Sequence, residues 1–163
     1  MIILRQLCTF LVGEHLFGLD IERVQEILLP PPLTRVPGAP PEVAGLLNLR
    51  GQIVPAIDLR RRLELPAGAA PSDAPHVVLR GDDGAVSLRV DAIGDILPLE
   101  DAALAPLPDN LRGALRTMLL GVHALPDRLL LVLSADAVVD GLAPAAATPS
   151  PSPSILALPQ ESR

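Results

Sequence analysis

The stretch "GLLNLRGQIVPAIDLR", residues 45–60, places an apolar run on each side of an Arg-Gly pair. Short apolar runs that flank a Gly-containing turn are typical of a β-hairpin. Arg50 stands at the turn, where Asn or Asp is the more usual residue before Gly51. Two interpretations stay open: something other than turn propensity keeps Arg50 there, or Gly51 alone satisfies the turn and Arg50 extends into solvent.

The same pattern occurs a second time in the chain. "GVHALPDRLLLVLSAD", residues 121–136, aligns with residues 45–60 without a gap. The alignment places Pro126-Asp127 on Arg50-Gly51 and Ser134 on Asp58. Upstream, residues 10–28 and 78–97 correspond more loosely. The chain therefore reads as two copies of one plan, each with a hairpin, a connecting segment, a second hairpin and a short helix, and each copy has about the size of a small SH3-like barrel.

Other segments fit this mainly β plan with one ambiguity. Residues 76–90 predict a hairpin with a Gly-Asp-Asp-Gly turn, and residues 66–75 have linker composition. In residues 20–29 the apolar spacing favours a short helix that Asp20 caps and the following prolines end. A strand over residues 24–28 is the alternative. Ala, Pro and Ser dominate residues 144–163, which predicts a disordered tail.

Composition excludes several classes of partner. The chain has 13 basic residues, all arginine, against 19 acidic ones, so its formal net charge is −6 and its pI about 4.9. This negative charge disfavours binding to phosphate backbones. With no Trp, no Tyr and two Phe, the chain also lacks the aromatic platforms on which single-stranded nucleic acid stacks, so we expect no nucleic-acid partner. A lone cysteine, Cys8, forms no internal disulfide and reads as a small buried residue. No apolar run reaches the length of a membrane span, so we expect a cytoplasmic protein without membrane insertion.

The sequence offers little to a catalytic mechanism. His15, His76 and His123 are far apart and none lies at metal-ligand spacing with another His or Cys. Phosphate-binding, nucleophile-elbow and zinc-hydrolase motifs are absent from the sequence. We therefore predict no enzyme activity, no metal site and no cofactor. The run Arg60-Arg61-Arg62 is predicted to be the solvated face of a short helix.

Two further residues have positions of interest besides Arg50. Glu26 follows Gln25 in an apolar frame and is expected to project beside Val24. Gly45 opens the strand that leads to Arg50, where a missing Cβ either permits close approach by another backbone or marks a bulge. Arg is the residue that interfaces favour for a forked pair with a carboxylate.

Three segments, "VQEIL", "VAGLLNLRGQIVPAIDLR" and "LPDRLLLVLSADAVV", in this order and at these separations, resemble the CheW-like family of chemotaxis coupling proteins. The resemblance covers about residues 5–140 and implies a CheW-like domain over residues 1–143. It implies two intertwined five-stranded SH3-like barrel subdomains that share a hydrophobic core, with short helices. It also implies a non-catalytic adaptor that joins the cytoplasmic tips of chemoreceptors to the regulatory domain of a histidine kinase.

The resemblance further implies which residues contact partners and where the protein acts. Val24, Glu26, Gly45 and Arg50 fall where the family carries residues important for coupling. The expected location is the cytoplasm, with recruitment to membrane-associated receptor arrays. Two alternatives stay open: an adaptor or inhibitor that binds only the kinase in a pilus or surface-sensing pathway, and a β-barrel module that binds a small molecule. The Pro-rich segment 28–40 departs from the family and leaves open which array is served.

Overall fold

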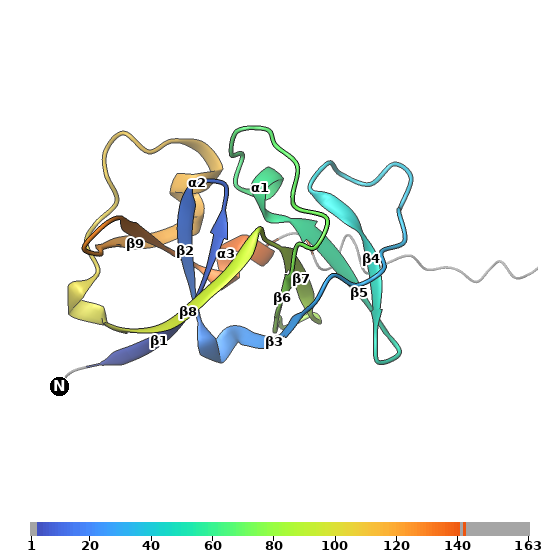
Figure 1. Cartoon of the computed structure of the whole chain (residues 1–163), viewed down its shortest axis with the longest axis horizontal. Coiled ribbons are helices and arrows are strands. Elements are labelled where there is room, and N and C mark those ends of the chain that lie inside the picture. The colour runs from blue at the N-terminus through green and yellow to red at the C-terminus, as the bar shows by residue number, and fades with distance from the viewer. Residues whose placement is uncertain (1–2, 141, 143–163) are drawn as a thin grey trace, which may run out of the picture.

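The computed structural model describes residues 3–140 and residue 142, and it consists mainly of two five-stranded sheets (Figure 1). The first sheet contains β1 (Leu4–Val12), β2 (His15–Asp20), β8 (Ala92–Glu100), β9 (Leu119–Ala124) and β10 (Leu129–Leu133). The second contains β3 (Val24–Leu28), β4 (Val43–Leu49), β5 (Gln52–Asp58), β6 (His76–Leu79) and β7 (Val86–Arg89). The short helices are α1 (Leu59–Arg62), α2 (Gly113–Met118), α3 (Ala135–Val139) and the 3₁₀ turns η1 (Ile21–Arg23) and η2 (Asp101–Ala103).

Each sheet is assembled from both halves of the chain. The strand orders are β8-β1-β2-β10-β9 and β3-β6-β7-β5-β4. Each half of the chain begins with a leading hairpin, β1–β2 or β6–β7. The strand that follows each hairpin pairs with the other half: β3 with β6, and β8 with β1. Parallel contacts β2–β10 and β7–β5 occupy the same place in the two sheets. The predicted two five-stranded units are confirmed. Each unit combines the leading hairpin of one half with the three later strands of the other, so neither unit consists of one half alone.

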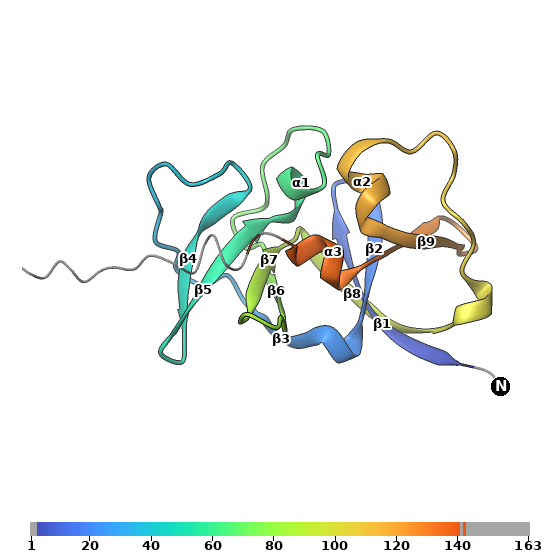
Figure 2. The same ribbon diagram turned by 180° about the vertical axis from the view of Figure 1, so that it is seen from behind.

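One hydrophobic core joins the two sheets, which lie side by side in both views (Figures 1 and 2). Its buried members come from the first sheet, such as Phe10, Phe17 and Leu19, and from the second, such as Ile57, Val77 and Leu88. The two Phe rings stack with centroids 6.1 Å apart. Branched aliphatic side chains fill the rest, as a chain with so few aromatic residues requires. The shared core predicted from the resemblance is therefore confirmed.

A single bridge brings the two edges of each sheet together. After β3, Thr34 exchanges two backbone hydrogen bonds of 2.8 Å with Leu46 on β4. After β8, Ala105 exchanges bonds of 2.7 and 3.0 Å with Val122 on β9. In both cases the segment that follows one edge strand bonds to the opposite edge strand, which is how a sheet closes toward a barrel.

The helix predicted for residues 20–29 is wrong, and the alternative strand is confirmed. Only Ile21–Arg23 form a 3₁₀ turn, which Asp20 caps by accepting a hydrogen bond from the Glu22 amide. β3 follows at once, and Ile27 and Leu28 pair with Val77 and His76 of β6. The apolar spacing fits a helix, but the backbone groups of β6 need a partner, and tertiary pairing overrides local propensity. The predicted hairpins at Arg50-Gly51 and at residues 76–90 are present.

The arginines of α1 are not the solvated face that the sequence predicted, except for Arg61, whose side chain is 64% exposed. The Arg60 guanidinium pairs with Asp91 at 2.8 Å. The Arg62 guanidinium donates to the Val138 carbonyl at the end of α3 at 2.9 Å. Both side chains are mostly buried because they join α1 to other elements, a tertiary role that a basic run does not announce. The tail predicted over residues 144–163 lies outside the described residues.

Candidate functional site

The turn between β4 and β5 is held by its own backbone and by one side chain. Arg50 and Gly51 have φ angles of 52° and 86°, the pair of positive values that a tight type I′ hairpin turn requires. The Gly51 amide donates to Oδ1 of Asn48 at 2.8 Å. Arg50 has a Cβ and so occupies this region at some cost, which the Asn48 contact offsets. The turn therefore fixes the direction in which Arg50 leaves the backbone.

Arg50 meets Glu26 in a forked ion pair. Its Nη1 and Nη2 atoms lie 2.5 and 2.7 Å from the two carboxylate oxygens of Glu26. Glu26 belongs to β3, which lies at one edge of the second sheet, whereas the hairpin with Arg50 forms the other edge. The Arg50 side chain remains 70% exposed and that of Glu26 21%. The pair thus connects the two edges at the surface, and the outer side of the guanidinium stays open to a partner.

The ion pair shifts the protonation equilibria of both groups. The hydrogen bond from Arg50 is the largest cause that lowers the pKa of Glu26 to about 2, against a smaller opposing effect of desolvation. A 3.3 Å hydrogen bond from the Gln25 amide favours the carboxylate further. The hydrogen bond with Glu26, followed by its negative charge, raises the pKa of Arg50. At neutral pH both groups are charged, so the site presents a fixed carboxylate and guanidinium.

Gly45 lies in β4, five residues before Arg50, where the backbone of Thr34 passes close by. A Cβ built on Gly45 would lie 2.8 Å from the Thr34 carbonyl oxygen and 3.2 Å from Cβ of Leu33. The register of β4 against β5 also shifts between Val43 and Gly45. Both readings of this glycine therefore apply, a bulge and a close backbone approach. The approaching backbone belongs to this chain.

Val24, the fourth candidate, is placed in the interior. It is 8% exposed, belongs to the shared core and pairs with Leu79 of β6. The structure thus brings Glu26 and Arg50 together, places Gly45 in β4 away from the turn, and buries Val24 in the core. A role in partner binding stays a prediction for all four residues.

Sequence reasoning missed the contact between Glu26 and Arg50 and the apolar surface nearby. Ile27 and Leu29, beside Glu26, are 43% and 84% exposed, and Ile53 on β5 is 55% exposed. Glu26 and Arg50 are 24 residues apart in the sequence, so their contact can be predicted only once the two edges of the sheet are known to meet. The exposed isoleucines read in sequence as ordinary core positions of strands.

The histidines and the cysteine have structural surroundings. His76 is buried, its Nδ1 lies 2.8 Å from Oγ of Ser87, and desolvation, together with Arg89, lowers its pKa to about 4. Burial raises the pKa of the Cys8 thiol. Among residues 3–140 and 142, no three His, Cys, Asp or Glu side chains gather as metal ligands would. Within that same part of the chain, no helix is long and apolar enough to cross a membrane.

Comparison with known proteins gives a consistent set of likenesses. Residues 6–143 match the CheW-like domain. The chain is 34% identical over 134 residues to "Chemotaxis protein CheW" of Rhizobium meliloti, a match that covers 82% of this chain and 86% of that protein. It is 27% identical to the protein of the same name from Bacillus subtilis, with 83% and 86% covered. The crystal structure of scaffolding protein TtCheW from Thermoanaerobacter tengcongensis superposes with a TM-score of 0.76 at 24% identity, covering 85% of this chain and 94% of that one, which shows the same fold.

Proposed function

The chain belongs to the CheW-like family, and from this membership we propose that it is a non-catalytic adaptor that couples chemoreceptors to a histidine kinase. The family match across residues 6–143 carries the proposal, because it spans both sheets and their shared core. The receptor contributes its cytoplasmic tip and the kinase its regulatory domain. The adaptor works in the cytoplasm and is recruited to receptor arrays at the membrane.

The mechanism is thermodynamic. An adaptor that binds receptor and kinase on separate faces raises their effective concentration without any new contact between them. It transmits a signal only if its contacts differ between the states of the receptor, since a ligand with equal affinity for both states shifts nothing. Two sheets built around one core supply a rigid body that keeps the two faces in fixed relation.

Within this mechanism, the Glu26–Arg50 pair orients one of the binding faces. Glu26 holds the guanidinium in a single direction while most of the Arg50 side chain stays exposed. A carboxylate of the receptor binds the open side of that guanidinium, and the exposed Ile27 and Ile53 supply apolar contact on the two strands that the pair connects. Val24 is buried in the core on the same strand as Glu26, and Gly45 allows the close approach of the Thr34 backbone farther along β4.

Co-sedimentation with a receptor cytoplasmic fragment and the histidine kinase tests the proposal. Wild type is expected to bring the kinase down with the receptor and to raise its phosphorylation rate. Arg50→Glu places two carboxylates together and should reduce the kinase recovered by roughly tenfold. Arg128→Glu, at the turn of the corresponding hairpin β9–β10, is the matched control and should leave recovery unchanged. Wild type that binds neither receptor nor kinase contradicts the adaptor proposal.

The double variant Glu26→Arg/Arg50→Glu separates two roles of the pair. It keeps an ion pair between the strands but reverses the charge that faces outward. If the pair only holds the hairpin, the double variant restores coupling. If the receptor reads the Arg50 cation, coupling stays low although the fold is intact by circular dichroism. Wild type that binds the kinase but not the receptor fragment would favour the kinase-only adaptor instead.

A further inference from the structure

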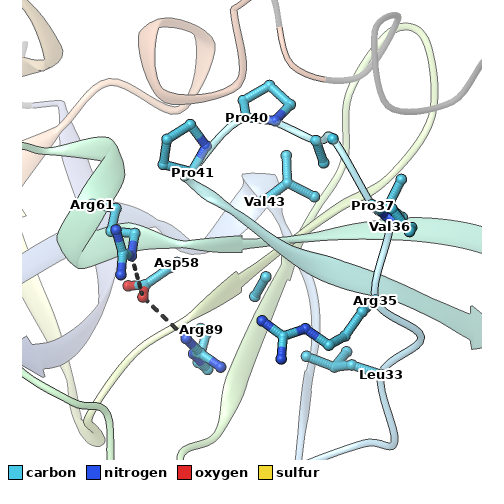
Figure 3. Close-up of a pocket in the computed structure, with 13 residues that line it drawn as sticks. Leu33, Arg35, Val36, Pro37, Pro40, Pro41, Val43, Asp58, Arg61 and Arg89 are labelled. Atoms are coloured by element: carbon cyan, nitrogen blue, oxygen red, sulfur yellow. Dashed lines mark hydrogen bonds and ion pairs between the residues drawn. The ribbon is translucent and has the colours of Figure 1, made fainter.

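A hollow of about 820 Å³ lies at the opposite end of β5 from Arg50. The segment between β3 and β4 forms one wall with Leu33 to Pro41, and the ends of β5 and β7 and the start of α1 form the other (Figure 3). Seven residues of β5 separate it from the Arg50 turn, a distance of about 20 Å along the strand. The hollow is therefore separate from the Glu26–Arg50 ion pair.

Its charged lining is mostly cationic. Arg35, Arg61 and Arg89 line the hollow together with a single carboxylate, Asp58. Asp58 lies 3.0 Å from Nη2 of Arg89 and 3.8 Å from Nε of Arg61. Three guanidinium groups against one carboxylate leave two positive charges uncompensated. The excess stands out in a chain whose formal net charge is −6.

Two of the arginines retain unused donors. Arg35 has no hydrogen-bond or ion-pair partner among residues 3–140 and 142, and its side chain points toward Arg89 (Figure 3). Within the described chain, Nε of Arg89 is buried without a hydrogen-bond partner, whereas Arg35 is exposed to solvent. Guanidinium groups repel one another, so an anion with several oxygens placed among the three arginines would relieve that repulsion and accept hydrogen bonds from Arg35.

The frame of the hollow suits a small ligand. Pro37, Pro40 and Pro41 restrict the backbone of the outer wall, while Arg61 and Arg89 stand on a helix and a strand. A volume of about 820 Å³ lies within the range of pockets for small molecules. Arg binds phosphate oxygens through forked hydrogen bonds, and an anion of charge −2 or more would balance the two surplus charges.

We propose that this hollow is a binding site for a compact polyanion of the phosphate class, held by Arg35, Arg61 and Arg89. The ligand connects the segment between β3 and β4 to the ends of β5 and β7. This inference goes beyond the adaptor function and does not depend on it. Arg35 lies on the wall formed by the segment between β3 and β4, and Arg61 and Arg89 lie on the wall formed by α1 and β7. An anion bound by all three arginines therefore draws the two walls together.

Calorimetric titration of the full chain with pyrophosphate tests the site. The titration is run at constant ionic strength, since exposed charges are screened by salt. Wild type should bind, and Arg35→Gln should weaken binding by roughly tenfold or more, because one charge-assisted fork is lost. Arg128→Gln removes the same charge far from the hollow and should bind like wild type. Hydrogen exchange of residues 35–39 should slow when pyrophosphate is added.

Three results would overturn the proposal. One is the absence of heat when wild type is titrated with millimolar pyrophosphate. Another is an equal loss of binding in Arg35→Gln and Arg128→Gln, which indicates general charge attraction. A tetraglutamate peptide that binds where pyrophosphate does not would assign the hollow to an acidic protein segment. A substitution of Arg89 would not test the site alone, because its contact with Asp58 also supports the fold.

Discussion

The hairpins β4–β5 and β9–β10 occupy equivalent places in the two sheets, and they differ mainly at their turns. Their registers agree pair by pair: Gly45 with Ala56 corresponds to Gly121 with Val132, and Asn48 with Ile53 corresponds to Ala124 with Leu129. Each hairpin ends in a capping residue, Asp58 or Ser134, whose side chain accepts a bond from the following helix. The backbone plan is thus repeated in detail, while the chemistry at the turn is not.

The partner strands show the same difference. Strands β3 and β8 are paired in the same register with their neighbours. In β3, Val24 pairs with Leu79 and Leu28 with His76. In β8, Ala92 pairs with Leu11 and Ile96 with Cys8. Glu26 then corresponds to Gly94, and Arg50 to Pro126. A Cβ on Gly94 would lie 2.6 Å from Oγ1 of Thr9, so this place has no room for a side chain. One copy carries an exposed ion pair where the other carries close packing, so the charged pair is a feature of one copy alone.

The largest effect is expected where the copies are most alike. A Cβ on Gly45 meets the Thr34 carbonyl at 2.8 Å, and one on Gly121 meets the Ala105 carbonyl at 2.6 Å. Gly45→Ala and Gly121→Ala should each lower the free energy of unfolding by about 3 kcal/mol, because a backbone must move. Denaturant unfolding measures both.

Gly51→Ala is the control for the glycine substitutions. Its Cβ meets nothing within 4 Å, so only its φ of 86° opposes the change, and the expected loss is about 1 kcal/mol. If Gly45→Ala or Gly121→Ala costs no more stability than Gly51→Ala, the two bridges that close the sheets, Thr34–Leu46 and Ala105–Val122, are not equivalent.

The capping residues should separate the copies. Asp58→Ala removes the cap on Arg60 and the ion pair with Arg89, and should cost about 2 kcal/mol. Ser134→Ala removes only the bond from the Ala137 amide and should cost about 1 kcal/mol. Thermal and denaturant unfolding of both variants test the ranking. Equal losses would show that the Asp58 ion pairs add nothing to the cap.

The sequence predicted the features that are local or repeated. The turn at Arg50-Gly51 was predicted from its residues, and the ungapped match of Gly45 with Gly121 and of Asp58 with Ser134 describes the structure correctly. These features depend on residues near one another in the chain, where turn and capping preferences act directly.

Features that depend on the partner strand could not be predicted. The β3 segment has helical spacing but becomes a strand because β6 needs an edge partner. No strand is predicted from the sequence for residues 92–100, although they form β8 and pair with most of β1. The contact of Arg50 with Glu26 requires the sheet to close, and the burial of Arg60 requires Asp91 from the other half. In each case the missing information is a long-range pairing.

The smallest effect, and the most specific to one copy, concerns the pH dependence that the ion pair adds. The folded pKa of Glu26 is about 2, below its usual value of 4.5. A lowered carboxylate pKa contributes stability above the unfolded pKa, and this contribution is lost as the pH falls through the folded pKa. The stability difference between wild type and Glu26→Gln should therefore stay constant from pH 7 to about 5 and shrink from about 4.5 toward 2.

Denaturant unfolding across this pH range measures the difference, and it should be small because the pair is exposed to solvent and screened by salt. Asp127→Asn, at the turn of β9–β10, gives the comparison within the same protein. Since no ion pair with Asp127 is present among the described residues, its variant should track wild type at every pH. If Asp127→Asn changes the acid branch as much as Glu26→Gln does, the two turns are electrostatically alike and the ion pair does not distinguish them. If only Glu26→Gln does, the asymmetry between the two copies lies where the adaptor proposal needs it, at the one turn that presents a held cation.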